Sequence, residues 1–202
     1  MAKKFVLRGG RKGFRALGWE TGAGCSGTCA IGGLRGSALV ALGFRTRTTK
    51  DVDIVALMES GGELTSPDPL PEFLTKAAAQ VARDLGLFDD WLNNGPSQGE
   101  GGLFQMGLPV GFPERLVARS YGPRLTVYFI GSLDQIYFKL YAAVDQGGDP
   151  THVADLQSLT PTETELEAAA RWTMTHDTSD GFKSVMQELL KEMGYGSVAK
   201  NI

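Results

Sequence analysis

Two aspartates that stand two residues apart, Asp51 and Asp53, are the side chains of this sequence best suited to chemistry. In a β-strand such residues point to the same side, about 6–7 Å apart at their Cα atoms. Two carboxylates on one face repel each other unless a cation lies between them. Because Mg²⁺ prefers carboxylate and phosphate oxygens, the pair predicts a site for Mg²⁺ and a nucleotide. Alone, however, an Asp-x-Asp pair is more often a strand end whose acids face solvent.

The residues before the two aspartates favour phosphate binding. Gly36-Ser37 predicts a tight turn that opens a short helix, with free backbone N–H groups and a hydroxyl for a phosphate. Arg45 and Arg47 follow in the return loop, where a guanidinium could neutralise a triphosphate. The turn, the helix, the cationic loop and the acidic strand together predict a site for Mg²⁺ and a nucleoside triphosphate.

The same residues resemble those of a known family. A Gly-Ser pair, thirteen intervening residues and then Asp51-Val-Asp53 resemble the motif of the DNA polymerase β-like nucleotidyltransferases, a superfamily that includes the minimal nucleotidyltransferases. The finer string Arg47-x-Thr49-x-Asp51-x-Asp53 resembles the AbiEii-type branch, which includes toxins of bacterial toxin–antitoxin pairs. Farther along, Lys139 and the Asp155-Leu dipeptide resemble the later family motif, so that the resemblance covers residues 36–172.

The resemblance implies a function and a role for each matching residue. It implies transfer of a nucleotide monophosphate from an NTP to a hydroxyl of tRNA or of a protein, by in-line displacement at the α-phosphate. An antitoxin partner is also implied. The implied roles are Mg²⁺ binding for Asp51 and Asp53, triphosphate or nucleotide binding for Gly36, Ser37, Arg45, Arg47 and Thr49, phosphate contact for Lys139, and positioning or deprotonation of the attacking hydroxyl for Asp155.

One departure from the family keeps a second hypothesis open. Many members carry a third metal-binding carboxylate on a later strand, whereas the strand expected at residues 125–130 has no acid. The alternative is therefore a catalytically impaired module with the same fold that binds a nucleotide or a protein. A third hypothesis is an interaction protein whose acidic C-terminal helices hold a basic partner.

Hydrophobic periodicity predicts the elements that would position these residues. Lys139 flanks the apolar stripe of its helix, so outside the family context it reads as a lysine that extends to the surface. Trp91 and Phe112 read as core or loop-anchoring aromatics rather than as platforms for a base. A capping box is expected at Thr160-Pro-Thr-Glu163. The expected strands are 52–57, 116–119 and 125–130, and the expected helices are 71–85, 133–144, 149–159, 161–172 and 181–193, with a loop at 59–70.

These elements predict an α+β fold, a small mixed β-sheet of nucleotidyltransferase type with packed helices and a helical C-terminal part. The expected division is an atypical segment at residues 1–34, the core at 35–160 and the helical part at 161–202. Composition is that of an ordinary globular protein, with 42% hydrophobic and 21% charged residues. Two cysteines and no long apolar run lead us to expect a cytoplasmic protein without a membrane partner.

Charge is distributed unevenly along the chain. Residues 1–50 carry ten Lys or Arg and one Glu, about +9, whereas the rest carries ten bases and 22 acids, about −12. Clustered cations next to clustered carboxylates suit a polyanion bound through a metal, and a basic arm that is merely solvated fits the same numbers.

Overall fold

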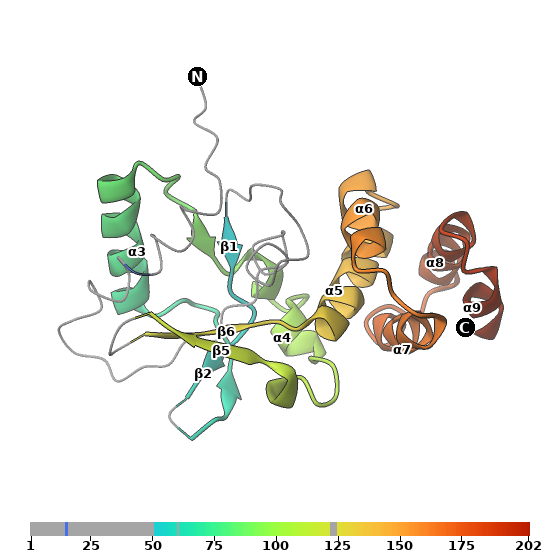
Figure 1. Cartoon of the computed structure of the whole chain (residues 1–202), viewed down its shortest axis with the longest axis horizontal. Helices are drawn as coiled ribbons and strands as arrows, with labels where there is room; N and C mark the ends of the chain where they lie inside the picture. The colour runs from blue at the N-terminus through green and yellow to red at the C-terminus, as the bar shows by residue number, and fades with distance from the viewer. Residues whose placement is uncertain (1–14, 16–50, 60, 122–124) are drawn as a thin grey trace. The chain divides into compact units, whose positions relative to one another are not determined.

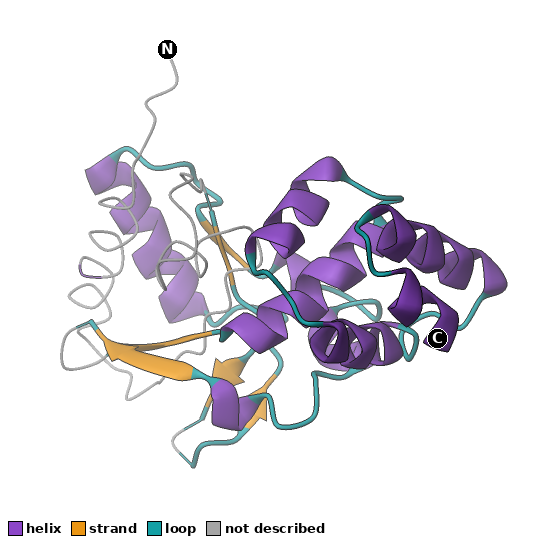
Figure 2. Ribbon diagram, turned by 45° about the vertical axis from the view of Figure 1, so that its right-hand side comes forward, coloured by secondary structure: helices purple, strands orange, loops and turns teal. Residues whose placement is uncertain are grey.

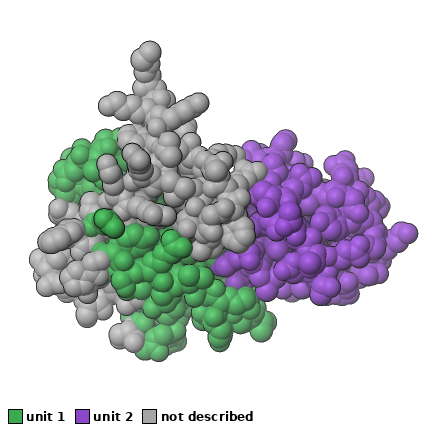
Figure 3. Space-filling view, viewed as in Figure 1, with its two compact units in different colours: residues 1–130 green, residues 131–202 purple. Residues whose placement is uncertain are grey.

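The computed structural model describes residue 15 and residues 51–59, 61–121 and 125–202. The chain divides into two compact units, residues 1–130 and residues 131–202 (Figures 1 and 3). We call them the first unit and the helical unit. In the described part of the chain, no helix has both the length and the apolar character needed to cross a bilayer.

In the first unit, helix α3 (Glu72–Leu85) supplies one wall of the core. Its apolar stripe buries Leu74, Ala77, Ala78, Val81 and Ala82. Glycine at position 86, with φ 64°, lets the chain leave the helix in the left-handed region and donate its N–H to the carbonyl of Ala82. The expected helix is confirmed, and Phe73 in its first turn is 39% exposed.

The described strands form three two-stranded sheets rather than one mixed sheet. Strand β1 (Val52–Asp53) pairs in parallel with β4 (Leu92–Asn93), and β2 (Leu57–Met58) pairs antiparallel with β3 (Leu64–Thr65). Strands β5 (Val117–Ser120) and β6 (Thr126–Phe129) form the expected antiparallel hairpin. The single strand expected at 52–57 is therefore wrong, and β3 lies within the stretch expected to be a loop.

Short helical turns connect these strands. They are η1 (Gly95–Ser97), α4 (Leu103–Met106) and η2 (Pro113–Arg115). Helices and small sheets together confirm the α+β class, as the secondary structure in Figure 2 makes visible. The nucleotidyltransferase core and the expected boundary at residue 160 stay predictions.

The helical unit contains α5 (Ser132–Asp145), α6 (Pro150–Ser158), α7 (Glu163–Thr173), α8 (Asp180–Glu192) and α9 (Gly196–Asn201). Helix α6 begins as expected, with the Asp149 carboxylate accepting the N–H of Thr151 at 2.7 Å. The sequence did not predict α9. Hydrogen bonds tie it and the residues around it to neighbouring helices, among them Ser197 Oγ to Glu163 at 2.8 Å and Gln187 Nε2 to the carbonyl of Ala199 at 3.0 Å.

The capping box of α7 lies two residues later than expected. Thr162 accepts the N–H of Glu165 at 3.2 Å, and the Glu165 carboxylate accepts the N–H of Thr162 at 2.8 Å. Thr160 has φ 48°, the left-handed region that often ends a helix, and its N–H donates to the carbonyl of Gln157. Because an N-cap residue needs extended backbone, Thr160 cannot cap α7 while it ends α6.

Candidate functional site

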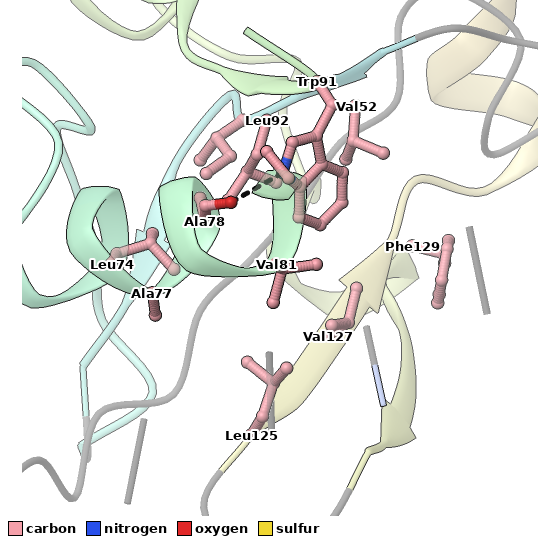
Figure 4. Close-up of a cluster of buried hydrophobic side chains, with 12 residues drawn as sticks. Val52, Leu74, Ala77, Ala78, Val81, Trp91, Leu92, Leu125, Val127 and Phe129 are labelled. Atoms are coloured by element: carbon pink, nitrogen blue, oxygen red, sulfur yellow. Dashed lines mark hydrogen bonds between the residues drawn. The ribbon is translucent and has the colours of Figure 1, made fainter. Parts of the chain in front are cut away.

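The acidic strand β1 separates its apolar and acidic side chains onto two faces. Val52 and Ile54 belong to the core of the first unit, packed with Leu92 of the paired strand. Figure 4 shows Val52 beside Trp91 and Leu92. Since side chains alternate along a strand, Asp51 and Asp53 point to the opposite face. Strand geometry thus predicts that both carboxylates share one side of the strand, which also carries the buried Val55.

The two aspartates differ in burial. Asp53 is only 2% exposed, whereas Asp51 is half-buried. A buried carboxylate is stable only when hydrogen bonds, cations or a metal compensate its charge. Its neighbour is open enough to meet a ligand from solvent. This combination of one fixed and one accessible carboxylate gives hard oxygen ligands of the kind that Mg²⁺ takes.

Strand β4 holds β1 in place along one edge through backbone hydrogen bonds. Val52 donates its N–H to the carbonyl of Trp91 at 2.6 Å, and Ile54 donates to Asn93 at 2.7 Å. Trp91 itself is buried and donates its Nε1–H to the carbonyl of Ala78 in α3 at 3.0 Å (Figure 4). The tryptophan is therefore a core anchor that links α3 to the strand pair, as the sequence indicated, and does not offer a surface for a base.

Lys139 and Asp155 come together in the helical unit. Lys139 Nζ lies 3.0 Å from Asp155 Oδ2, and the two side chains are 1% and 4% exposed. The first comes from α5 and the second from α6. The interpretation of Lys139 as a lysine that reaches the surface is wrong, because its ammonium group is buried and paired. The family-derived roles of the two residues stay predictions.

A partly buried aromatic cluster lies in the same unit. The ring of His176 stands edge-on to Trp172, with 4.3 Å between ring centroids, and 5.3 Å from that of Tyr141. Burial lowers the pKa of His176, because it disfavours the charged imidazolium. Burial, with smaller contributions from Asp145 and Asp177, raises the pKa of Tyr141. The cluster is a partly buried packing contact within the helical unit.

Five of the predicted site residues lie outside the described residues. They are Gly36, Ser37, Arg45, Arg47 and Thr49. Among the residues that the structure describes, no group of three or more His, Cys, Asp or Glu side chains gathers in a way that could hold a metal ion. The two aspartates alone would be enough for Mg²⁺, which commonly takes one or two carboxylates together with phosphate oxygens and water.

Sequence reasoning gave no role to the glycine-rich stretch at residues 93–102. Its Ser97 is fully buried and donates its hydroxyl to the carbonyl of Val55, two residues after Asp53, at 2.9 Å. The only local signal was the turn-forming string Asn93-Asn-Gly-Pro-Ser97, which predicts a loop but not its target.

Comparison with known proteins found no relative of this chain. No family model matches the chain, and neither the curated proteins nor the solved structures give a match.

Proposed function

We propose that this chain is a Mg²⁺-dependent nucleotidyltransferase that moves a nucleotide monophosphate from an NTP to a hydroxyl of tRNA or of a protein. The observation that carries the proposal is that Asp53, buried in β1, and the half-buried Asp51 lie two residues apart on a backbone that is hydrogen-bonded to β4. Acids two residues apart on a paired strand have a fixed backbone and a shared direction. Both properties suit a metal site.

The residues would divide the work as follows. Asp51 and Asp53 would hold Mg²⁺, which would neutralise phosphate charge and polarise the reacting phosphoryl group. The Gly36-Ser37 turn and the arginines at 45 and 47 would hold the triphosphate. Lys139 and Asp155 now compensate each other's charge. In the proposed reaction, Lys139 would exchange this partner for a phosphate, and Asp155 would accept the proton of the attacking hydroxyl.

The alternative is a fold that binds Mg²⁺ and NTP but does not turn over. It is favoured by the absence of a third metal-ligating carboxylate near the pair in the described chain and by the sequence of β6, Thr-Val-Tyr-Phe, which contains no acid. Both hypotheses share the binding step. They differ only in whether the nucleotide is then transferred to an acceptor, and the experiments test the two steps separately. The cytoplasmic setting and an antitoxin partner belong to the first proposal.

Calorimetry of NTP binding with and without Mg²⁺ tests the shared step. The test variant is Asp51→Asn with Asp53→Asn, which keeps side-chain size and removes two charges. The matched control is Asp89→Asn with Asp90→Asn, an exposed pair in the same unit. We expect metal-dependent NTP binding in the wild type and control and its loss in the test variant. Unchanged binding in the test variant, or none in the wild type, would sink the proposal.

Transfer is tested separately with an α-phosphate-labelled NTP and a mixture of tRNA and protein acceptors. Label that appears on tRNA or protein, and only with Mg²⁺, supports the enzyme. Binding without any label on an acceptor, together with no release of pyrophosphate, favours the impaired module.

A further inference from the structure

The glycine-rich segment 93–102 is fastened to the acidic strand by a buried hydrogen bond. Ser97, at the end of η1, is 0% exposed and donates its Oγ–H to the carbonyl of Val55 at 2.9 Å. Ladder pairing of β1 with β4 ends at the Ile54 N–H. A buried carbonyl beyond the ladder still needs a donor, which the serine provides. The strand is therefore held at two points directly after Asp53, the Ile54 N–H and the Val55 C=O.

Within the segment, Gly102 packs so closely against the backbone of Ser97 that no larger residue fits at position 102. A Cβ on Gly102 would lie 2.5 Å from the carbonyl carbon of Ser97 and 2.6 Å from its oxygen. Because these are backbone atoms, no side-chain movement could relieve such a clash. Glycine at 102 is thus required for the chain to close over Ser97, and this closure keeps the serine next to Val55.

A second set of polar contacts fastens the outer side of the segment. Asn94 is buried and donates its Nδ2 to the carbonyl of Pro67 at 2.9 Å, while its Oδ1 accepts from Gln98 at 3.0 Å. The carboxylate of Asp68 accepts the N–H of Gly99 at 3.0 Å. Contacts on both sides restrict the segment far more than a connecting loop of this composition requires.

We propose that segment 93–102 is a latch that fixes the acidic strand so that Asp53 is held ready for Mg²⁺, with Ser97 as the positioning residue. The Mg²⁺ in this inference comes from the proposed function. The restraint of the strand comes from the hydrogen bonds described above. A ligand held before the metal arrives loses less freedom on binding, so the metal binds more tightly. Ser97 acts only through the backbone of the strand.

The test measures two properties of the full chain, the affinity for Mn²⁺ alone as a spectroscopic substitute for Mg²⁺ and the hydrogen exchange of the Ile54 amide. For Ser97→Ala we expect the Kd for Mn²⁺ to rise about tenfold, as for other supports of metal ligands, and exchange at Ile54 to quicken by on the order of tenfold. Asp68→Ala, at an exposed residue, should raise the Kd for Mn²⁺ and the exchange rate of the Ile54 amide by smaller factors. Ser184→Ala, which removes an exposed hydroxyl bond to the carbonyl of Asp180 in α8, should move neither.

The outcomes separate the latch from the proposed function. Faster exchange with unchanged Mn²⁺ affinity, in variants still folded at the assay temperature, would show that the segment only supports the core and would overturn the positioning role. Unchanged exchange in Ser97→Ala and Asp68→Ala would overturn the latch itself. Wild-type protein that binds no Mn²⁺ would refute the metal site, while the exchange result would still decide whether the segment fixes the strand.

Discussion

The Lys139–Asp155 pair places two opposite charges inside the helical unit, and this burial determines what each residue contributes. Removing charges from water costs desolvation free energy. The attraction between the two charges offsets this cost only while both are present. A buried pair is therefore weak evidence for added stability, yet removal of one partner leaves an uncompensated charge. The pair is best understood as a constraint that keeps α5 and α6 in one register.

Removal of the lysine should consequently be severe. We expect Lys139→Met to lower the free energy of unfolding by about 3–5 kcal/mol, because Asp155 would remain buried and unpaired. The matched control is Lys76→Met, which breaks the exposed Lys76–Glu72 pair in α3 and should cost less than about 1 kcal/mol. Urea denaturation checks both values. Equal, small effects of the two changes would contradict the burial argument.

The His176 ring gives a prediction about pH. Burial lowers its pKa in the folded state, so between that value and the ordinary value of about 6.5 the unfolded chain binds the extra proton. Stability contributed by the neutral ring is therefore complete above about pH 6.5 and decreases as the pH falls below it. Denaturation midpoints measured between pH 7.5 and about pH 5 should show this decrease in the wild type.

The histidine is identified by substitution. His176→Phe, which keeps an aromatic ring between Trp172 and Tyr141, should flatten the pH dependence over that range. His152→Gln serves as the control, because it removes the chain's only other histidine and should leave the dependence in place. If the His152 variant flattens the curve instead, the assignment to His176 is wrong.

At the scale of elements, the junction between α6 and α7 shows where sequence rules reach their limit. The string Thr160-Pro-Thr-Glu-Thr-Glu165 contains the capping-box pattern in two registers. We expect Thr162→Ala to lower the free energy of unfolding by about 1 kcal/mol, because it removes the N-cap acceptor of α7. Thr160→Ala should change it by less than about 0.5 kcal/mol. Thermal denaturation of the two variants decides between the registers, and the reverse order of effects would favour the earlier one.

The long helices could be predicted because each carries its own apolar stripe, so α3 and α5 were expected within one or two residues. The two-residue strands β2 and β3 could not, since neither is long enough to show alternation. The shared face of Asp51 and Asp53 stays a prediction from strand geometry. The sequence did not predict that Lys139 is buried against Asp155. The two residues lie on different helices, and the periodicity of one helix says nothing about its neighbour.

At the scale of the whole molecule, each compact unit has its own buried apolar residues. Leu74 of α3 belongs to the core of the first unit, and Leu166 of α7 is buried in the helical unit. A core that is complete within a unit should allow that unit to open without the other. The aspartate of β1 and the Lys139–Asp155 pair then belong to elements of separate stability.

Reciprocal substitutions test this independence. Leu74→Ala and Leu166→Ala should each cost about 2–5 kcal/mol, because both remove a fully buried side chain and leave a cavity. Native-state hydrogen exchange should then quicken in α3 and β1 for the first variant and in α7 and α8 for the second. Each variant is the matched control of the other, since the chemical change is identical. If either change raises exchange equally in both units, the molecule opens as one cooperative body, and the acidic strand and the buried ion pair share a single stability.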